Sequence, residues 1–323
     1  MEAYEATASN RRQFLLKPPG LLFMSETLPV TERENPKTAD IDRVSTIDAL
    51  RLINDEDKLV AKAVGQEIAR IADVIDRVVE RLKKGGRLFY IGTGTSGRLG
   101  VLDASEIPPT FGVSPEIVRG LIAGGVDALY KAAEASEDDR DAGKEDLQKM
   151  GIGPLDSVIG IAASGRTPYT IGAVEFARGL GCFTACITCN PDSPITQAVD
   201  IAIAVVTGPE VITGSTRLKA GTATKMILNM ISTAAMIRLG YVIGNRMTNV
   251  RPSNEKLRDR SLRILISETG METSAAFDLL CESNEDLRVA LVMARASVNR
   301  EAAESALRDA NFVVERALEY FRK

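Results

Sequence analysis

The order of apolar runs along the chain constrains its fold more than any other feature of the sequence. Five short runs of continuous apolar residues alternate with segments of helical periodicity. Such runs are typical of strands that are covered on both faces, as in parallel sheets whose connections are helices. The pattern therefore predicts a doubly wound α/β domain with a five-stranded parallel sheet. The strands are expected at 87–91, 117–122, 157–162, 183–189 and 201–206.

Helical patterns surround these strands and continue beyond them. A boundary at Arg251-Pro252-Ser253-Asn254 separates the sheet domain from a C-terminal part in which only helical patterns occur. We predict an extended arm at 1–45, an α/β domain at 46–250 with a core at about 78–241, and a small all-helical domain at 251–323. The predicted helices are 46–58, 59–84, 97–104, 125–149, 168–180, 218–239, 255–268, 272–281, 286–294 and 299–322.

The composition excludes several kinds of protein. The 323 residues include no histidine, so acid–base chemistry must use Asp, Glu, Lys, Tyr or Cys. The net charge of −4 argues against general binding to nucleic acid or to anionic membranes. No apolar stretch approaches the ~18 residues of a membrane span. We predict no metal, no redox cofactor, no nucleic-acid partner and no membrane partner.

Three of the four cysteines, Cys182, Cys186 and Cys189, have a spacing similar to the iron–sulfur ligands of radical enzymes. The segment alternates as a strand, however, which would place Cys182 and Cys186 about 13 Å apart. The same alternation turns Cys186 and Cys189 to opposite sides. We interpret these residues as buried thiols in a reducing compartment.

The N-terminal residues are polar and interrupted by prolines, which predicts an arm without regular structure. Arg11-Arg12 and the apolar residues after them are similar to a twin-arginine export signal. The segment Lys-Pro-Pro-Gly at 17–20 interrupts the apolar region that such a signal needs. We therefore expect a cytoplasmic protein. The sequence leaves open whether Met1 or Met24 is the start.

The first strand and the loop after it, at 88–109, give the strongest indication of function. Three glycines, Gly92, Gly94 and Gly97, alternate with hydroxyl side chains in a loop that opens a helix. Glycines let an anion approach the backbone, and the helix N-terminus supplies positive potential. Dinucleotide-binding folds share this glycine pattern, but they carry an acidic residue at the end of the next strand. This chain has Ala-Gly-Gly there, so we favour a sugar phosphate over a dinucleotide.

Two further loops of the same kind follow predicted strands, Ser-Gly-Arg-Thr-Pro at 164–168 and Thr-Gly-Ser-Thr-Arg-Leu-Lys at 213–219. One such loop is typical of an ordinary turn with a Ser or Thr cap. In a doubly wound sheet all three loops lie at the carboxyl edge, where ligands bind, and together they favour one phosphate site. The residues expected to bind the substrate and its phosphate are Thr93, Thr95, Ser96, Arg98, Ser164, Arg166, Thr167, Ser215 and Lys219.

Two acidic clusters also follow strands, Asp-Ala-Ser-Glu at 103–106 and Glu-Ala-Ser-Glu-Asp-Asp at 134–139. Acidic runs are usually solvated helix faces, and this alternative stays open for the second cluster. From the residues alone, Glu106 ranks above Glu137 because apolar residues follow it directly.

Several long motifs resemble those of the N-acetylmuramic acid 6-phosphate etherases. The resemblance runs from about Thr31 into the C-terminal helices. It implies a sugar isomerase (SIS) domain with a flavodoxin-like sheet, a C-terminal region similar to a ubiquitin-associated domain, and a homodimer with residues of both subunits near the site. The motifs are NDEDK at 54–58, GTGTSGR at 92–98, LDASE at 102–106, AASGRTP at 162–168 and GPEVITGSTRLKAGT at 208–222.

The resemblance also implies a carbon–oxygen lyase that acts without a cofactor. The family cleaves the D-lactyl ether of N-acetylmuramic acid 6-phosphate by elimination and water addition, which gives N-acetylglucosamine 6-phosphate and D-lactate. It assigns the general acid to Glu106 and a second catalytic glutamate to Glu137, which we expect to remove the C2 proton. The 208–222 motif also occurs in glucokinase regulatory proteins. A non-catalytic regulator that binds a sugar phosphate is therefore the alternative.

Overall fold

The computed structural model describes residues 28–131, 136–248 and 255–322. Its centre is a five-stranded parallel sheet with the strand order β2-β1-β3-β4-β5. All five predicted strands are confirmed, each within two residues of its expected ends. The strands are β1 (Leu88–Gly92), β2 (Val118–Ile122), β3 (Ser157–Ile161), β4 (Phe183–Thr188) and β5 (Ile201–Ala204).

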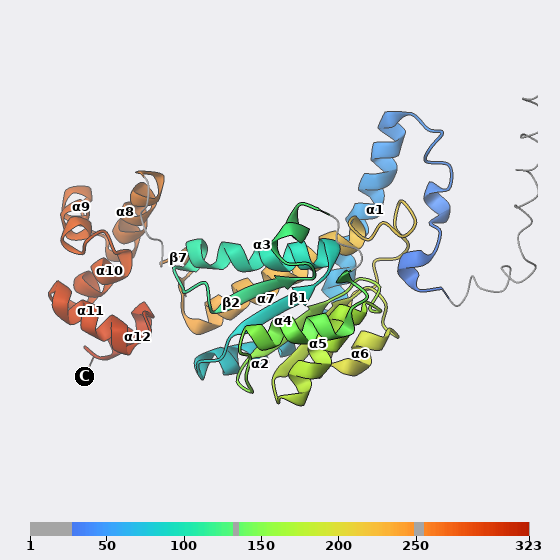
Figure 1. The fold of residues 1–323 in the computed structure, drawn as a ribbon. Helices are drawn as coiled ribbons and strands as arrows, with labels where there is room; N and C mark the ends of the chain where they lie inside the picture. The colour runs from blue at the N-terminus through green and yellow to red at the C-terminus, as the bar shows by residue number, and fades with distance from the viewer. Residues whose placement is uncertain (1–27, 132–135, 249–254, 323) are drawn as a thin grey trace, which may run out of the picture.

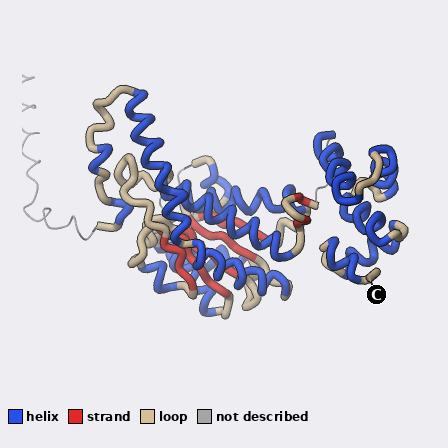
Figure 2. The backbone as a smooth tube through the Cα atoms, turned by 180° about the vertical axis from the view of Figure 1, so that it is seen from behind, coloured by secondary structure: helices blue, strands red, loops and turns tan. Residues whose placement is uncertain are grey.

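Helices cover both faces of the sheet, as Figures 1 and 2 show. Alternate strand residues point to opposite faces, so Leu88 and Tyr90 of β1 belong to one apolar core while Phe89 and Ile91 belong to the other. The first core packs against α1 (Thr46–Gln66), α2 (Ile68–Lys83), α3 (Gly94–Phe111) and α7 (Lys219–Leu239). The second packs against α4 (Arg140–Lys149), α5 (Pro168–Gly179) and α6 (Pro194–Ala198).

Three predicted helices of the sheet domain differ from the structure. α1 continues past its predicted end at 58 to Gln66, because Val60 and Val64 are buried on the same face as Glu56 and extend the helix by two turns. The expected helix at 125–149 consists of a short 3-10 turn, η4 (Val126–Leu129), and of α4, whose start is capped by the Asp139 carboxylate. α3 extends from Gly94 to Phe111, well beyond the predicted 97–104, and includes two prolines in its last turn.

The described part of the predicted N-terminal arm is not extended. Residues 28–45 form two 3-10 turns, η2 (Val30–Glu32) and η3 (Pro36–Thr38), and they contact the sheet domain through several hydrogen bonds. Residues 1–27, which include Met24 and the paired arginines, lie outside the described part of the chain.

The C-terminal region is helical as predicted and has an apolar core of its own. It gathers at the end of the molecule opposite α1 (Figure 1). The expected last helix is two helices, because Asn311 and Phe312 adopt positive φ angles and break it. The predicted boundary at 251–254 lies outside the described residues. The helices are α8 (Glu255–Thr269), α9 (Thr273–Glu282), α10 (Leu287–Ala296), α11 (Arg300–Asp309) and α12 (Val314–Glu319).

A small antiparallel hairpin of β6 (Val242–Ile243) and β7 (Arg246–Met247) follows α7 and was not predicted. An ion pair between Arg246 and Glu268 joins this hairpin to α8. Among the described residues, none of the helices is long and apolar enough to span a membrane.

Candidate active site at the carboxyl edge of the sheet

The glycine-rich loop after β1 leads directly into the N-terminus of α3. Gly92 and Gly97 are required by close packing, because a Cβ at Gly97 would lie 2.6 Å from the Gly92 carbonyl oxygen. Gly94 has a φ of +49°, and α3 begins at this residue. The side chains of Thr95 and Ser96 are half-buried beside it. The loop thus presents hydroxyl groups at the positive end of an 18-residue helix, an arrangement suited to an anion.

Glu137 lies against this helix N-terminus. Its Oε1 atom is 3.3 Å from the position that a Cβ of Gly94 would take. Its backbone carbonyl accepts a hydrogen bond of 3.1 Å from the amide of Tyr169 at the start of α5. Glu137 therefore contacts the start of α3 through its carboxylate and the start of α5 through its backbone, which differs from the solvated helix face that the charge run alone suggests.

The loop after β3 places Ser164 and Thr167 at the same edge of the sheet. Gly165 turns this loop with a φ of +69°, and a Cβ there would clash with the Ser193 side chain. The Ser164 hydroxyl accepts a weak hydrogen bond from the Arg166 amide, while the Arg166 side chain is exposed. Thr167 precedes Pro168, the first residue of α5.

The loop before α7, residues 208–218, lies beside the first loop. Thr95 Cγ2 is 3.6 Å from the position that a Cβ of Gly221 would take, so the starts of α3 and α7 are neighbours. Ser215 is half-buried in this loop. Glu210 accepts hydrogen bonds of 2.9 Å from the amides of Lys219 and Ala220, so these N–H groups of α7 are already occupied by a carboxylate. Only the side chains of this loop are then available to the phosphate that the sequence predicts here.

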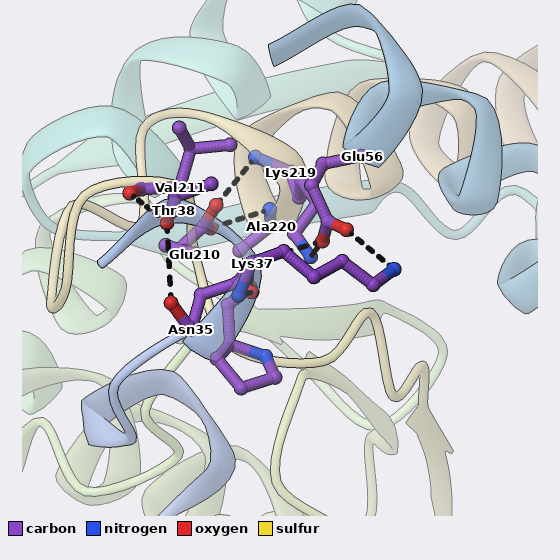
Figure 3. A network of polar contacts seen from close by, with 9 residues as sticks. Asn35, Lys37, Thr38, Glu56, Glu210, Val211, Lys219 and Ala220 are labelled. Carbon is purple, nitrogen blue, oxygen red and sulfur yellow. Dashed lines mark hydrogen bonds and ion pairs between the residues drawn. The ribbon is translucent and has the colours of Figure 1, made fainter. Parts of the chain in front are cut away.

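Lys219, expected at the phosphate, is instead part of a buried network (Figure 3). Its ammonium lies 2.6 Å from Glu56 Oε2, and its side chain is 1% exposed. Lys37 and Asn35 also donate to the Glu56 carboxylate. Burial alone would raise the pKa of Glu56, but the hydrogen bonds from Lys219, Lys37 and Asn35 together outweigh it and lower the pKa to about 2. The Glu56–Lys219 pair connects α1 to the loop before α7.

Arg98 is also engaged within the protein. Its guanidinium donates to the backbone carbonyls of Ala128, Leu129 and Lys131, at 2.7, 3.0 and 3.0 Å. These bonds hold the segment after β2, which leads toward Glu137. The geometry supports a structural role for Arg98 in placing that segment.

Glu106 lies on α3, far from the phosphate loops of its own chain. Twelve residues separate it from Gly94, or about 18 Å along the helix axis. Glu106 is exposed and borders a cavity of ≈ 460 Å³ that Asn229, Thr233 and Asp103 also line. Asp103 is buried and accepts hydrogen bonds from Asn229 and Ser232, and its burial raises its pKa. One chain therefore does not bring Glu106 and Glu137 together around a single sugar ring.

The cysteines are buried as expected. Cys182, Cys186 and Cys189 are free thiols in or beside β4. Burial raises the pKa of Cys186 and of Cys189 to about 12, which disfavours the thiolate that a metal or a nucleophilic reaction requires. In the described parts of the chain, no group of three or more Cys, Asp or Glu residues is arranged to hold a metal ion.

Sequence reasoning missed three residues that shape this site, namely Asn190, Glu56 and Glu210. Asn190 is the second residue after β4. The rule that selected the other loops, position at the carboxyl end of a strand, would also have selected it. Glu56 and Glu210 stand inside motifs already singled out at 54–58 and 208–222. Their partners are distant in sequence, so no local pattern identifies the pairing.

Comparison with known proteins gives consistent family matches. Residues 70–178 match the glucokinase regulatory protein N-terminal SIS domain, and residues 140–234 match the SIS domain. Similar curated proteins are the N-acetylmuramic acid 6-phosphate etherases of Clostridium botulinum strain Langeland, 50% identical over 88% of this chain and 95% of the relative, and of Photorhabdus laumondii, 51% identical over 86% and 93%. The N-acetylmuramic acid 6-phosphate etherase 1 of Bacillus licheniformis is 50% identical over 91% and 96%.

Among solved structures, a phosphoheptose isomerase from Francisella tularensis is similar to part of this chain. Its TM-score is 0.41 at 17% identity, over 59% of this chain and 100% of that one.

Proposed function

This chain belongs to the family of N-acetylmuramic acid 6-phosphate etherases, and on that premise we propose that Glu137 and Glu106 are its catalytic base and acid. The chain cleaves the D-lactyl ether of N-acetylmuramic acid 6-phosphate in the catabolism of cell-wall amino sugars. The products are N-acetylglucosamine 6-phosphate and D-lactate. The reaction is an elimination followed by addition of water.

Glu137 removes the C2 proton of the ring-opened sugar. The observation that supports this role most directly is the position of its carboxylate, whose Oε1 atom is 3.3 Å from the Cβ position of Gly94 in the first hydroxyl-rich loop. The N-terminus of α3 supplies positive potential at this place. Ser96, Ser164, Thr167 and Ser215 bind the 6-phosphate, with Thr93, Thr95 and Arg166 next to them on the same edge. Arg98 and Lys219 act indirectly, by holding the segments on which the site is built.

Glu106 donates a proton to the ether oxygen as lactate leaves, and it acts on the substrate bound to a second subunit. The distance of about 18 Å along α3 is longer than a sugar ring, so the Glu106 of the same chain does not reach the bond. In a homodimer, the exposed Glu106 of one subunit can reach the ether bond of the substrate bound at the phosphate loops of the other subunit. The apolar groove between α2 and α7, of ≈ 610 Å³ and lined by Ile71, Met226 and Ile237 among others, supports a subunit interface near Glu106.

The first experiment measures D-lactate released from N-acetylmuramic acid 6-phosphate, and deuterium uptake at C2 in heavy water. Glu137→Gln should abolish both, since general acid–base groups contribute about 10²–10⁴-fold. Glu106→Gln should block lactate release but keep slow C2 exchange in the substrate, because proton removal does not require a protonated leaving group. Exchange that is retained in Glu137→Gln and lost in Glu106→Gln would mean that the two roles are reversed.

A sugar-phosphate-binding regulator is the second candidate, favoured by the match of residues 70–178 to the glucokinase regulatory protein domain. It is the less supported reading, because the similar curated proteins that cover most of the chain are etherases. Wild-type protein that binds the sugar phosphate but releases no lactate would favour the regulator. A cytoplasmic location is part of our proposal and is supported by the free thiols of Cys182, Cys186 and Cys189.

A further inference from the structure

The side chain of Asn190 lies directly beneath the loop that carries Ser164. Asn190 follows β4 at the carboxyl edge of the sheet and is 6% exposed. Its Nδ2 atom donates to the backbone carbonyls of Ala163 and Ser164, at 3.0 and 3.3 Å. One buried amide thus fixes two successive peptide units of the loop.

The other partners of this amide come from the N-terminal strap, by which we mean residues 30–38. The Oδ1 atom of Asn190 accepts a hydrogen bond of 2.7 Å from the Val30 amide. Its Nδ2 atom also lies 3.2 Å from the hydroxyl of the buried Thr31, so the two hydrogens of Nδ2 are shared among three acceptors. Both ends of the amide are therefore satisfied, and rotation of the side chain would break the bonds to the strap and to the loop together.

The same strap reaches the loop before α7. The Thr38 hydroxyl donates to the Val211 carbonyl at 2.8 Å, and Glu32 Oε2 is 3.4 Å from the Cβ position of Gly214. Asn35 donates to Glu56 at 3.0 Å, which connects the strap to the buried pair in Figure 3. A single short segment therefore contacts the loop before α7 directly and is connected to the Ser164 loop through Asn190.

We propose that Asn190 is a positioning residue that, held by the N-terminal strap, places Ser164 for binding the phosphate of the substrate. This inference rests on the proposed function, because it requires Ser164 to be a phosphate ligand. Asn190 acts through the Ser164 loop and does not touch the reacting atoms. Since the phosphate is bound alike before and during the reaction, loss of this positioning raises KM and leaves kcat nearly unchanged.

The test begins with Asn190→Asp in the full-length protein. This change keeps the acceptor for Val30 but sets a carboxylate oxygen against the carbonyls of Ala163 and Ser164. We expect KM for N-acetylmuramic acid 6-phosphate to rise about tenfold or more, since a donor is replaced by a repelling group, with kcat within about threefold. The Kd of N-acetylglucosamine 6-phosphate, measured by calorimetric titration, should rise in parallel.

Variants of Thr31 test whether the strap helps to hold Asn190. They remove a single hydrogen bond and are therefore milder than Asn190→Asp. Thr31→Val removes one neutral hydrogen bond to Asn190, so KM should rise by about two- to tenfold. Thr31→Ser keeps the hydroxyl, and its KM should equal that of the wild type. Equal KM values for the Val and Ser variants would exclude the strap from the proposal.

Thr184→Val is the control for stability. Thr184 is fully buried at the opposite end of β4, where its hydroxyl donates to Asp200 at 3.0 Å. This variant should lower Tm without changing KM. If Thr184→Val and Asn190→Asp raised KM equally at similar Tm, Asn190 would have only a structural role and the proposal would be overturned.

Ser164→Ala separates this inference from the proposed function. If Ser164→Ala leaves KM unchanged, the phosphate assignment is wrong, whatever Asn190 does. If Ser164→Ala raises KM and Asn190→Asp does not, only the positioning role is wrong. In the double variant Asn190→Asp should add little to the effect of Ser164→Ala, since both act on the same hydroxyl, whereas fully multiplicative effects would contradict the proposal.

Discussion

The ammonium group of Lys219 is buried, and the carboxylate of Glu56 compensates for the loss of its hydration. Their side chains are 1% and 6% exposed, and the two charges lie 2.6 Å apart. Lys37 contacts the other oxygen of the same carboxylate at 2.9 Å, but 68% of its side chain is exposed. The two lysines thus share one acceptor and differ mainly in burial.

Replacement of each lysine by methionine compares these two environments. We expect Lys219→Met to lower the free energy of unfolding by about 3–5 kcal/mol, because it leaves a buried carboxylate without its closest cation. Lys37→Met should cost less than about 1 kcal/mol, as is usual for exposed pairs. Urea denaturation measures both values. Similar decreases of the unfolding free energy in the two variants would show that the burial of Lys219 does not strengthen its pairing with Glu56.

Glu56 should also make the stability depend on pH. Its pKa in the folded protein is about 2, below the ordinary value of 4.5, so the folded state favours the ionised form. The stabilisation is therefore complete above pH 4.5 and is lost as the pH falls from 4.5 toward 2. The difference in unfolding free energy between the wild type and Glu56→Gln should be constant from pH 5 to 7 and should shrink below pH 4.5. A difference that grows on acidification would contradict the assignment.

At the scale of elements, α3 connects the glycine-rich loop, where we propose that the phosphate binds, to Glu106. Its first turn packs so closely on β1 and β2 that Gly97 has no room for a side chain, with Gly92 O at 2.6 Å and Ile122 Cγ1 at 2.7 Å from its Cβ position. Gly65 in α1 is a helical glycine in the opposite situation, with nothing within 4 Å of its Cβ position. Gly65 therefore serves as the control for substitution of Gly97 by alanine.

Gly97→Ala should shift the start of α3, lower the free energy of unfolding by about 1–3 kcal/mol through overpacking and reduce lactate release strongly. Gly65→Ala should raise stability by up to ~1 kcal/mol, because alanine is the better helix former and meets no obstacle. Thermal melting and the lactate assay measure the two effects. Retained activity in Gly97→Ala would show that the loop tolerates displacement.

Much of this architecture follows from the sequence, because the buried strands are local apolar runs and each was located within two residues. The position of the three hydroxyl-rich loops at the carboxyl edge of the sheet also follows from the sequence, because each loop comes after a predicted strand. The contacts that the sequence did not indicate are non-local. Glu56 pairs with Lys219, 163 positions away, and Arg98 binds carbonyls about 30 residues further on. Asn190 after a strand is typical of a turn, and only the folded chain shows its contacts with the strap.

At the scale of the whole molecule, the separation of Glu106 from Glu137 predicts that sites are shared between subunits. Equal amounts of Glu106→Gln and Glu137→Gln protein, unfolded and refolded together, should regain about a quarter of the wild-type activity, because half of the dimers are mixed and each has one intact site. Each variant alone should stay inactive. If the mixture is as inactive as its components, both glutamates act within one chain or the protein does not exchange subunits, which size-exclusion chromatography of a tagged mixture distinguishes.

The continuity of α3 has a consequence for how its length can change. Each residue inserted between Gly97 and Glu106 would rotate the carboxyl group by about 100° around the helix axis and move it ~1.5 Å away from the loop. About seven added residues, two turns, would restore the direction but place the group ~10 Å farther along. A change in residue number therefore cannot preserve both the angle and the distance of Glu106. This stretch of α3 should accept substitutions on its exposed side far more readily than any insertion or deletion.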